Sequence, residues 1–584
     1  MNTSSAQITI VDVTGEHAVE SYMDTRDTDQ KIRDAVEVIK GKLVEGHSML
    51  CATSMGKDSS VLTMITLRAL RECVEENGSA PFVVFATSNT LVENPVMDQY
   101  ARGEAAKVRA YIAKHNLPAR MDIVTPSLSN HYYLQLIAGR TVATLPGNGA
   151  KCSMMLKVLP LNKHKKRVFA ELGSDKPVIT LIGKRFDESA ERGRTMAANG
   201  ENAMDAIEDS QGSLVLSAIS DFTLDDVMYT IGMVRSGRME TYSNFDELVE
   251  IYRAGNSGDC MINIYATGAA GSTGCGARYG CFVCARTSAD KSMENMLKED
   301  EYVWMRGLNK IRNWLVADHY NPDTRTWLSR SVQEDGTIVI APNSYSPQKC
   351  EDLLRYTLTV QIEEQEAAAR MGIEPRFFLI GPQETLYLDL AWNRYGYHRS
   401  LKACEIYQEV YEQGQRFYPP EDPIEYTRSA LPEVGTRVQF EDGHYDAPMS
   451  GFRDLESAVA DCERLVEKNG VQYVDANVAT EMRIDAEGAD MFFAFEIDYA
   501  LDRFADDYVA PAAGFHYLVR LGVVELSKGS HSENDRMLRM ANAIWRLGLR
   551  DHLSDPLALV EKLEAHFGSG KSTGGNYQHG LFAA

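Results

Sequence analysis

The first half of the chain alternates between two hydrophobic periods. Residues 31–43 place apolar side chains at the spacing of a helix, and residues 48–53 then form a short apolar run typical of a buried strand. The alternation continues with expected helices at 59–74, 96–115 and 161–172 and expected strands at 82–87, 121–125 and 178–182. This order predicts an α/β fold with a doubly wound parallel sheet, whose ligands bind at the carboxyl ends of the strands.

The second half follows a different pattern. Long amphipathic helices are expected at 302–316 and 349–371, and a Pro-rich break follows at residues 418–420. We expect this C-terminal region to be mostly helical, and its last part carries no motif that points to a chemistry. The predicted division is a tail at 1–30, an α/β domain at 31–300, a helical domain at 301–420 and an accessory region at 421–584.

Composition and charge narrow the class of protein. The chain has 584 residues, 44% of them hydrophobic, without a signal-peptide pattern or the run of about 20 apolar residues that crosses a membrane. We expect a cytoplasmic protein without membrane contact. The net charge of -23 argues against broad adhesion to nucleic acid, because Lys and Arg supply most of that affinity. Any DNA contact is expected to be local, at the basic stretch 151–194, for which a solvated helix face is the alternative.

The connection between the first expected strand and the next helix has the composition of a phosphate-binding loop. It consists of Ser54, Met55, Gly56, Lys57, Asp58, Ser59 and Ser60. Ser and Gly let the backbone turn tightly, so that its amides and the helix N-terminus point at an anion. Lys57 adds a positive charge, Asp58 is placed to hold Mg2+ or order the loop, and Ser59 is placed to bond a phosphate oxygen. The position between strand and helix favours a nucleotide triphosphate over an ordinary Ser- and Gly-rich turn.

A second charged segment follows the strand expected at 178–182. Arg185 and Arg192 carry planar cations suited to bidentate phosphate contacts, and Glu188 is able to orient an arginine or a metal-bound water. The alternative is a series of ion pairs along a helix surface, because Glu188 is spaced three and four residues from the two arginines. Since the segment leaves a strand at the ligand-binding edge, we favour the site.

Cysteines form the third candidate feature. Four of the ten fall in one short stretch, at Cys260, Cys275, Cys281 and Cys284. Scattered cysteines, most of them in apolar or helical surroundings, are interpreted as core or incidental residues, namely Cys51, Cys73, Cys350, Cys404 and Cys462. Cys281-x-x-Cys284 preceded by Cys275 has metal-ligand spacing, and Cys260 or the distant Cys152 completes four thiolates. Zinc, an iron–sulfur cluster and a reactive dithiol are the alternatives at this point.

Several segments together carry a family resemblance. Residues 54–60, 152–161, 183–192 and 221–227 resemble the PP-loop ATP pyrophosphatase and phosphoadenylyl-sulfate reductase superfamily. Within it, Glu93-Asn94-Pro95 and residues 278–284 look most like the DndC/SspD-type sulfurtransferase component of DNA phosphorothioation. The resemblance covers about residues 31–420. Loops of this superfamily more often have Gly where Met55 stands, so the turn is expected to be made with one less flexible residue.

The resemblance implies a fold of the adenine nucleotide alpha-hydrolase type with an iron–sulfur segment, and ATP, Mg2+ and a [4Fe-4S] cluster as cofactors. The implied catalytic residues are Lys57, Asp58 and Arg185. Nucleotide contacts are implied for residues 54–60 and for Glu93, Lys157, Arg185, Glu188, Ser189 and Arg192. Cluster ligands are implied at Cys281, Cys284 and two of Cys152, Cys260 and Cys275. The surplus thiol would then be available to carry a persulfide, because an accessible thiolate is the useful nucleophile.

The implied function is an ATP pyrophosphatase that adenylylates a DNA backbone phosphate and supports its replacement by sulfur. Implied partners are the DNA backbone, a cysteine desulfurase as sulfur donor and other phosphorothioation subunits. The nearest alternative is a phosphoadenylyl-sulfate or adenylyl-sulfate reductase, but the last cysteine lies in Asp461-Cys462-Glu463 rather than in the Glu-Cys-Gly tail of those enzymes. A tRNA thiolase and a nucleotide-sensing scaffold without turnover are the further alternatives.

Overall fold

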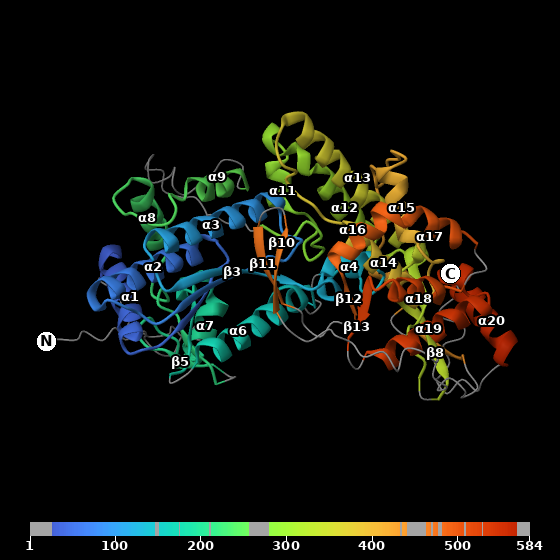
Figure 1. Cartoon of the computed structure of the whole chain (residues 1–584), viewed down its shortest axis with the longest axis horizontal. Helices are drawn as coiled ribbons and strands as arrows, with labels where there is room; N and C mark the ends of the chain where they lie inside the picture. Colours follow the sequence, from blue (N-terminus) through green and yellow to red (C-terminus); the bar gives the residue numbers. More distant parts are fainter. Residues whose placement is uncertain are drawn as a thin grey trace.

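The structure of the protein is a computed structural model that describes residues 26–145, 151–173, 176–209, 212–255, 279–333, 335–432, 435–440, 463–468, 471–476, 482–506, 510–527 and 530–568. In Figure 1 most of the chain through α9 (Asp246–Gly255) lies on the left and the later helices lie on the right, where α4 (Tyr132–Ile137) joins them. The strands β10 and β11 come late in the sequence, yet they stand beside β3 near the middle of the view.

Within the described residues, an eight-stranded sheet forms the centre of the left-hand part. Its strands are β1 (Met49–Ala52), β2 (Val83–Ser88), β3 (Ala119–Pro126), β4 (Ile179–Ile182), β5 (Ile207–Glu208), β6 (Leu214–Leu216), β10 (Glu463–Lys468) and β11 (Val471–Ala476). They lie in the order β10-β11-β3-β2-β1-β4-β6-β5. Neighbours from β11 to β6 pair in parallel, and β10 and β5 add antiparallel edges. The chain order reverses between β1 and β4, which is where an open parallel sheet binds its ligand.

Helices cover both faces of this sheet. Cys51 and Phe85 face a core that includes residues of α1 (Thr28–Val44), α2 (Lys57–Asn77), α3 (Pro95–Lys114), α8 (Leu224–Arg235) and α9. The alternate residues Leu50 and Val84 face the opposite core, where they meet Val168 of α6 (Leu159–Leu172). Successive strand residues point to opposite faces, so the continuous apolar runs seen in the sequence are those of strands buried on both sides.

Helix starts fix the two loops at the carboxyl ends of β1 and β2. Gly56 is the N-cap of α2 in an extended conformation, and the helix ends at Gly78 with a left-handed φ of 75°. At the start of α3 the Asn94 side chain accepts from the Val96 N–H, and Pro95 occupies the first helical position. The loops 53–56 and 89–94 are therefore held between a buried strand and a well-defined helix start.

The right-hand part is built around α14 (Pro382–Tyr395), whose residues from Glu384 to Tyr395 are all buried. A helix buried on every side needs neighbours all round, and α4 (Tyr132–Ile137), α15, α16, α18 and α19 pack against it. The helices of this part are α11 (Lys291–Met296), α12 (Arg306–Ala317), α13 (Pro347–Met371), α15 (Lys402–Tyr411), α16 (Ala486–Phe495), α17 (Ile497–Arg503), α18 (Ala512–Arg520), α19 (His531–Arg546) and α20 (Pro556–Phe567). Among the helices that the structure describes, none combines the length and apolar character needed to span a membrane.

Two small antiparallel sheets complete the right-hand part. One contains β7 (Arg325–Leu328), β8 (Thr337–Tyr345) and β9 (Thr436–Gln439), and the other pairs β12 (Met482–Ile484) with β13 (Val524–Leu526). The predicted mixed α/β architecture with a mostly parallel sheet is confirmed. Sheets cross the boundary expected at residue 420, because β9 pairs with β8 and β11 pairs with β3. The division into four parts therefore stays a prediction.

Candidate functional site

The loops that follow β1 and β4 meet at the reversal point of the sheet. Ala52 and Ile182, the last residues of these strands, are partners in the parallel ladder. Gly183 brings the second loop against the first, because a Cβ atom there would lie 3.2 Å from the Cα and 3.3 Å from the nitrogen of Ser59. Backbone atoms cannot move aside as a flexible side chain can, so this close approach depends on glycine.

The first turn of α2 presents backbone donors to this edge. Its N-cap residue, Gly56, has no side chain to accept from them, and the first N–H groups of a helix have no partner inside it. The Ser60 N–H donates back to the Gly56 carbonyl at 2.8 Å. The N–H groups of Lys57, Asp58 and Ser59 therefore emerge at a helix N-terminus, which suits an anion.

The loop serines have different roles in the structure. The Ser59 hydroxyl accepts from the Ser54 N–H at 3.1 Å and donates to the Gly56 carbonyl at 3.1 Å, so it holds the loop closed. Ser60 is fully buried. Ser54 is exposed, and its Oγ lies 3.1 Å from Ser59 Oγ. Among the three serines, Ser54 is therefore the one with an exposed side chain. Because the Ser59 hydroxyl is occupied within the loop, the phosphate contact expected of Ser59 would be made by its backbone N–H.

Met55 makes the turn in a conformation that favours glycine. Its φ is 55°, in the left-handed region that costs an L-residue roughly 1 kcal/mol or more. The side chain is completely buried, and its sulfur accepts from the Thr53 hydroxyl at 3.6 Å. The Met55 N–H donates to the same hydroxyl at 3.2 Å. Burial of the thioether thus offsets the backbone strain and attaches the loop to the hydrophobic core.

Asp58 gathers two cations around the loop. Arg185 donates from Nε to Asp58 Oδ1 at 2.6 Å and from Nη1 to Asp187 at 3.3 Å, and its side chain is only 3% exposed. Lys57 Nζ lies 3.8 Å from Asp58 Oδ2. The structure therefore brings the three expected catalytic residues together, with Asp58 occupied as the bridge between the cations.

The rest of the second segment behaves differently. Glu188 forms an ion pair with Arg192 one helical turn later, and Ser189 caps α7 (Ala190–Ala198) by accepting from the Arg192 N–H at 3.2 Å. The pair between Glu188 and Arg192 is the one that the alternative interpretation, an ion pair on a helix surface, predicted. Arg185 departs from it, because its carboxylate partners are Asp58 and Asp187.

Tyr252 is a loop neighbour that sequence patterns did not indicate. It belongs to α9, its ring centroid lies 5.6 Å from Lys57 Nζ, and its hydroxyl lies 3.7 Å from where a Cβ atom of Gly56 would stand. The distance from Lys57 suits a cation–π contact. Nothing in the spacing of residues 57 and 252 signals this contact, which only the packing of α9 against α3 creates.

Three of the described cysteines, Cys152, Cys281 and Cys284, lie near the carboxyl end of β2, one strand away from residues 54–60, the candidate phosphate loop. Cys281 forms a bridge of β type with Glu93, and the Phe282 N–H donates to the Val92 carbonyl at 2.9 Å. Lys157 pairs with Glu93 at 3.2 Å. Because β1 and β2 are adjacent parallel strands, this cysteine site and the phosphate loop share one edge of the sheet.

A π-helical turn brings Cys152 to the same place. Residues Met154–Val158 form the turn, and the Leu159 N–H donates to the Met154 carbonyl five residues earlier. Cys152 precedes this turn and lies near enough to Lys157 for its charge to raise the pKa of the lysine. The Leu156 carbonyl accepts from the Ser88 hydroxyl at 3.2 Å, which fixes the turn at the end of β2.

Cys281 is the cysteine whose pKa reflects the surroundings of this site. Burial raises the pKa of Cys281 to about 12, with further increases from the charges of Glu93, Cys284 and Cys152, while Lys157 acts in the opposite direction. The pKa of Lys157 is itself raised, because the attraction of Glu93 and Cys281 outweighs the opposing effect of burial. Lys157 and Glu93 therefore lie beside the cysteines, and the nucleotide contact expected of them stays a prediction.

Thiolate chemistry at this site fits zinc or an iron–sulfur cluster. Cys152, Cys281 and Cys284 supply three sulfurs, whereas Cys260 and Cys275 lie outside the described residues. Within the described part of the chain, no three His, Cys, Asp or Glu side chains are arranged closely enough to hold a metal ion. The expected ligand set of Cys281, Cys284 and two of Cys152, Cys260 and Cys275 therefore stays a prediction.

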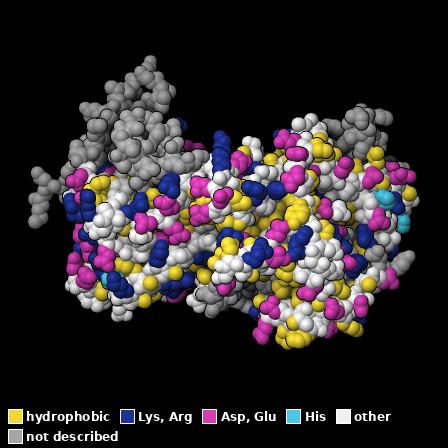
Figure 2. All heavy atoms as spheres, turned by 90° about the horizontal axis from the view of Figure 1, so that it is seen from above, with side chains coloured by type: hydrophobic (Ala, Val, Ile, Leu, Met, Phe, Trp, Pro, Cys, Tyr) yellow, Lys and Arg dark blue, Asp and Glu magenta, His cyan; other side chains and the backbone are white. Residues whose placement is uncertain are grey.

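The basic stretch 151–194 carries many charges that are already compensated. Ion pairs join Lys157 to Glu93, Lys165 to Asp209, Lys184 to Glu201, Arg185 to Asp58 and Arg192 to Glu188. Over the face shown in Figure 2, Lys and Arg side chains are likewise interspersed with Asp and Glu. Any nucleic acid bound here would have to exchange these carboxylates for phosphates.

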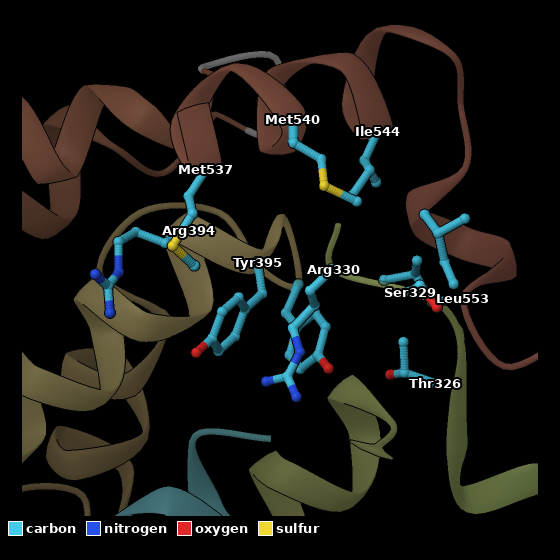
Figure 3. A pocket seen from close by; sticks show the side chains of 11 residues that line it. Thr326, Ser329, Arg330, Arg394, Tyr395, Met537, Met540, Ile544 and Leu553 are labelled. Atoms are coloured by element: carbon cyan, nitrogen blue, oxygen red, sulfur yellow. The ribbon is translucent and has the colours of Figure 1, made fainter. Parts of the chain in front are cut away.

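Two small pockets accompany these features. One lies at the ends of β2 and β3, where Asn89 donates to Asp98 at 2.8 Å and burial raises the pKa of Asp98. The other lies between β7, α14 and α19, where Arg330, Tyr395 and Met540 converge (Figure 3). Each has space for about one water molecule, so neither accommodates a nucleotide.

Comparison of the chain with models of protein families and with curated proteins gives no match. The candidate site therefore rests on its own geometry, which consists of a candidate phosphate loop and a group of cysteines at one edge of a parallel sheet.

Proposed function

We propose that this protein is an ATP pyrophosphatase of the adenine nucleotide alpha-hydrolase type that activates a DNA backbone phosphate for replacement by sulfur. One observation carries the proposal. Cys152 and Cys281 are far apart in the sequence, yet both lie near the end of β2, beside the loop that leaves β1. A sulfur site next to a phosphate site is the arrangement that an ATP-dependent sulfur insertion needs.

The phosphate loop would hold the triphosphate. The N–H groups at the start of α2 meet the phosphate oxygens, and Lys57 neutralises charge on the leaving pyrophosphate. Asp58 keeps Lys57 and Arg185 next to the loop. Asp58, the carboxylate of the loop, would hold Mg2+, which would supply further positive charge for the leaving pyrophosphate.

Adenylylation is the first proposed step. A nonbridging oxygen of the DNA phosphate attacks the α-phosphorus of ATP, the new phosphorus–oxygen bond forms, and the bond to pyrophosphate breaks. The donors of the loop are fixed before the charge develops, so they stabilise the transition state without reorganising. The product is a DNA phosphate that carries AMP as a leaving group.

Sulfur insertion is the second proposed step. A sulfur nucleophile at the oxidation level of sulfide attacks the activated DNA phosphorus, a phosphorus–sulfur bond forms, and AMP leaves with the oxygen. No electrons are exchanged in this step. We assign the supply of sulfur to a cysteine desulfurase, which delivers it as a persulfide. A thiol reductant converts this persulfide to sulfide, with formation of a disulfide, before the attack on phosphorus. We expect other phosphorothioation subunits to accompany this cytoplasmic reaction.

The cysteine site would hold a [4Fe-4S] cluster in this proposal. In this proposal Cys281, Cys284 and Cys152 would be ligands, and Cys260 or Cys275 would complete the set of four. A cluster of this kind supplies redox and sulfur chemistry when bound. Lys157 and Glu93 would set the charge around it, since they pair at 3.2 Å beside Cys281.

DNA would approach along the basic stretch that borders both sites. Because Lys157, Lys165 and Arg192 are paired with carboxylates, contact with DNA has to displace partners from the protein. We therefore expect weak binding that falls steeply as the salt concentration rises.

Release of pyrophosphate tests the proposal. The full-length chain with Mg-ATP and DNA is expected to form pyrophosphate and AMP, and Lys57→Ala is expected to lower the rate by about 100-fold or more, because a preorganised charge at the leaving group is lost. Lys310 belongs to α12 and pairs with Glu421, away from the loop. Lys310→Ala serves as the control and should retain activity. ATP binding without pyrophosphate release in the wild-type chain would instead support a nucleotide-sensing scaffold.

A further inference from the structure

Two tyrosines connect the phosphate loop with the cysteine site. Tyr252 stands over Lys57 at 5.6 Å, and its ring meets the ring of Tyr279 edge to face, with the centroids 6.1 Å apart. Tyr279 is followed directly by Gly280 and Cys281. We propose that Tyr252 and Tyr279 form an aromatic relay through which nucleotide at the phosphate loop changes the environment of the cysteine site. This inference rests on the proposed function and deepens it.

Tyr279 is held both to α9 and to the hydrophobic cores. The Tyr279 hydroxyl donates to the carbonyl of Ile251, the residue that precedes Tyr252, so the two rings are tied to one turn of α9. Tyr279 packs against both large hydrophobic cores, which makes it a contact between the two parts of the molecule. A displacement of Tyr252 is therefore transmitted to Tyr279 rather than absorbed by solvent.

The far end of the relay reaches the cysteines through the backbone. A Cβ atom on Gly280 would lie 3.8 Å from Cβ of Cys284, so the segment after Tyr279 is packed closely against the second cysteine. The Cys284 N–H donates to the Cys281 carbonyl at 2.9 Å. Movement of Tyr279 thus acts on a short turn that carries both thiols.

Helix α9 holds the relay in place from a third side. It packs on α3 and α11, and the Asn295 side chain donates to the Gly255 carbonyl at 3.1 Å. In Figure 1, α9 lies above α3 and reaches towards α11. The helix that carries Tyr252 therefore touches both the phosphate-loop side and the segment that follows the cysteines.

Nucleotide binding has a direct means of moving the relay. In this structure the Lys57 ammonium is shared between Asp58 and the face of the Tyr252 ring. A triphosphate in the loop competes for that ammonium with a much larger negative charge. When Lys57 turns to the phosphates, Tyr252 loses the cation that fixes its ring and the contact with Tyr279 readjusts.

Fluorine NMR of the full-length chain tests this relay. 3-Fluorotyrosine is placed at position 279, and the probe ligand is α,β-methylene ATP with Mg2+, which cannot be cleaved at the expected bond. We expect the resonance at position 279 to shift on binding. Tyr252→Leu should abolish the shift while changing the nucleotide Kd by less than about 5-fold, and Tyr252→Phe should keep the shift, because the ring is retained. A label at Tyr499, exposed on α17, is the control and should not respond.

The outcomes separate the relay from the proposed function. Binding measured by calorimetry without a shift at position 279, or a shift that persists in Tyr252→Leu, would overturn the relay and leave the proposed function standing. Absence of nucleotide binding in the wild-type chain would overturn both. Because the absence of a shift in the wild-type chain overturns the relay by itself, the proposal can fail even where the Leu variant does not fold.

Discussion

The phosphate loop and the cysteine site lie one strand apart, yet they are assembled in opposite ways. The loop is one contiguous stretch whose hydrogen bonds join residues 54, 56 and 59 to one another. At the cysteine site, Glu93, Lys157 and Cys281 come from three distant segments. A local motif carries its geometry with it, whereas a site made of distant residues exists only after the sheet has formed.

Metal content gives the largest expected effect and tests the composite site. Cys284→Ala and Cys152→Ala should each remove most of the iron and acid-labile sulfide from anaerobically purified protein, because a cluster loses a thiolate ligand. Cys73→Ala, at a buried cysteine in α2, is the matched control and should leave the content unchanged. Stoichiometric zinc without iron in the wild-type chain would contradict the cluster while keeping the thiolate site.

Sequence patterns indicated the contiguous features well and the distant ones incompletely. The helices and strands around residues 54–60 lie where their hydrophobic periods predicted them. For Arg185, sequence spacing offered Glu188 as the alternative partner in an ion pair. The sheet instead brings Asp58 from 127 positions away, and Arg185 donates to it. Strand β11 carries no motif. Its pairing with β3 depends on the exposed edge of β3, which the sequence around β11 does not indicate. Tyr252 and the π-turn at residue 154 were missed for the same reason, since neither has a periodic signal.

Buried charge at the loop gives the next largest effect. Arg185→Ala leaves Asp58, whose side chain is 18% exposed, beside Lys57 alone, and we expect the free energy of unfolding to fall by about 3 kcal/mol. Denaturant unfolding followed by circular dichroism measures it. Arg192→Ala, in an ion pair whose side chains are 47% and 32% exposed, is the matched control and should cost less than about 1 kcal/mol. Equal losses in the two variants would show that Arg185 is not part of the loop's support.

Met55 gives a smaller effect with an informative sign. Both Met55→Gly and Met55→Ala lose a buried thioether, but glycine accepts a φ of 55° and alanine does not. We therefore expect the Gly variant to be the more stable of the two by about 1 kcal/mol in denaturant unfolding. At Met64, buried within α2, the order should reverse, because glycine is the poorer helix former by about 1 kcal/mol. The same order at both positions would contradict a strained loop.

The smallest effect on stability is expected at Lys157, and it sharpens the contrast between the two sites. Its ion pair with Glu93 joins side chains that are 49% and 26% exposed, so Lys157→Ala should lower the free energy of unfolding by less than about 1 kcal/mol. The same lysine faces Cys152 and Cys281, and we expect the yield of phosphorothioate dinucleotides, measured by mass spectrometry of DNA, to fall by at least about 10-fold. Lys157→Arg keeps the charge and should recover part of that yield. A large loss of stability with an unchanged yield would show that the pair supports the fold, as Arg185 does at the loop, rather than the chemistry.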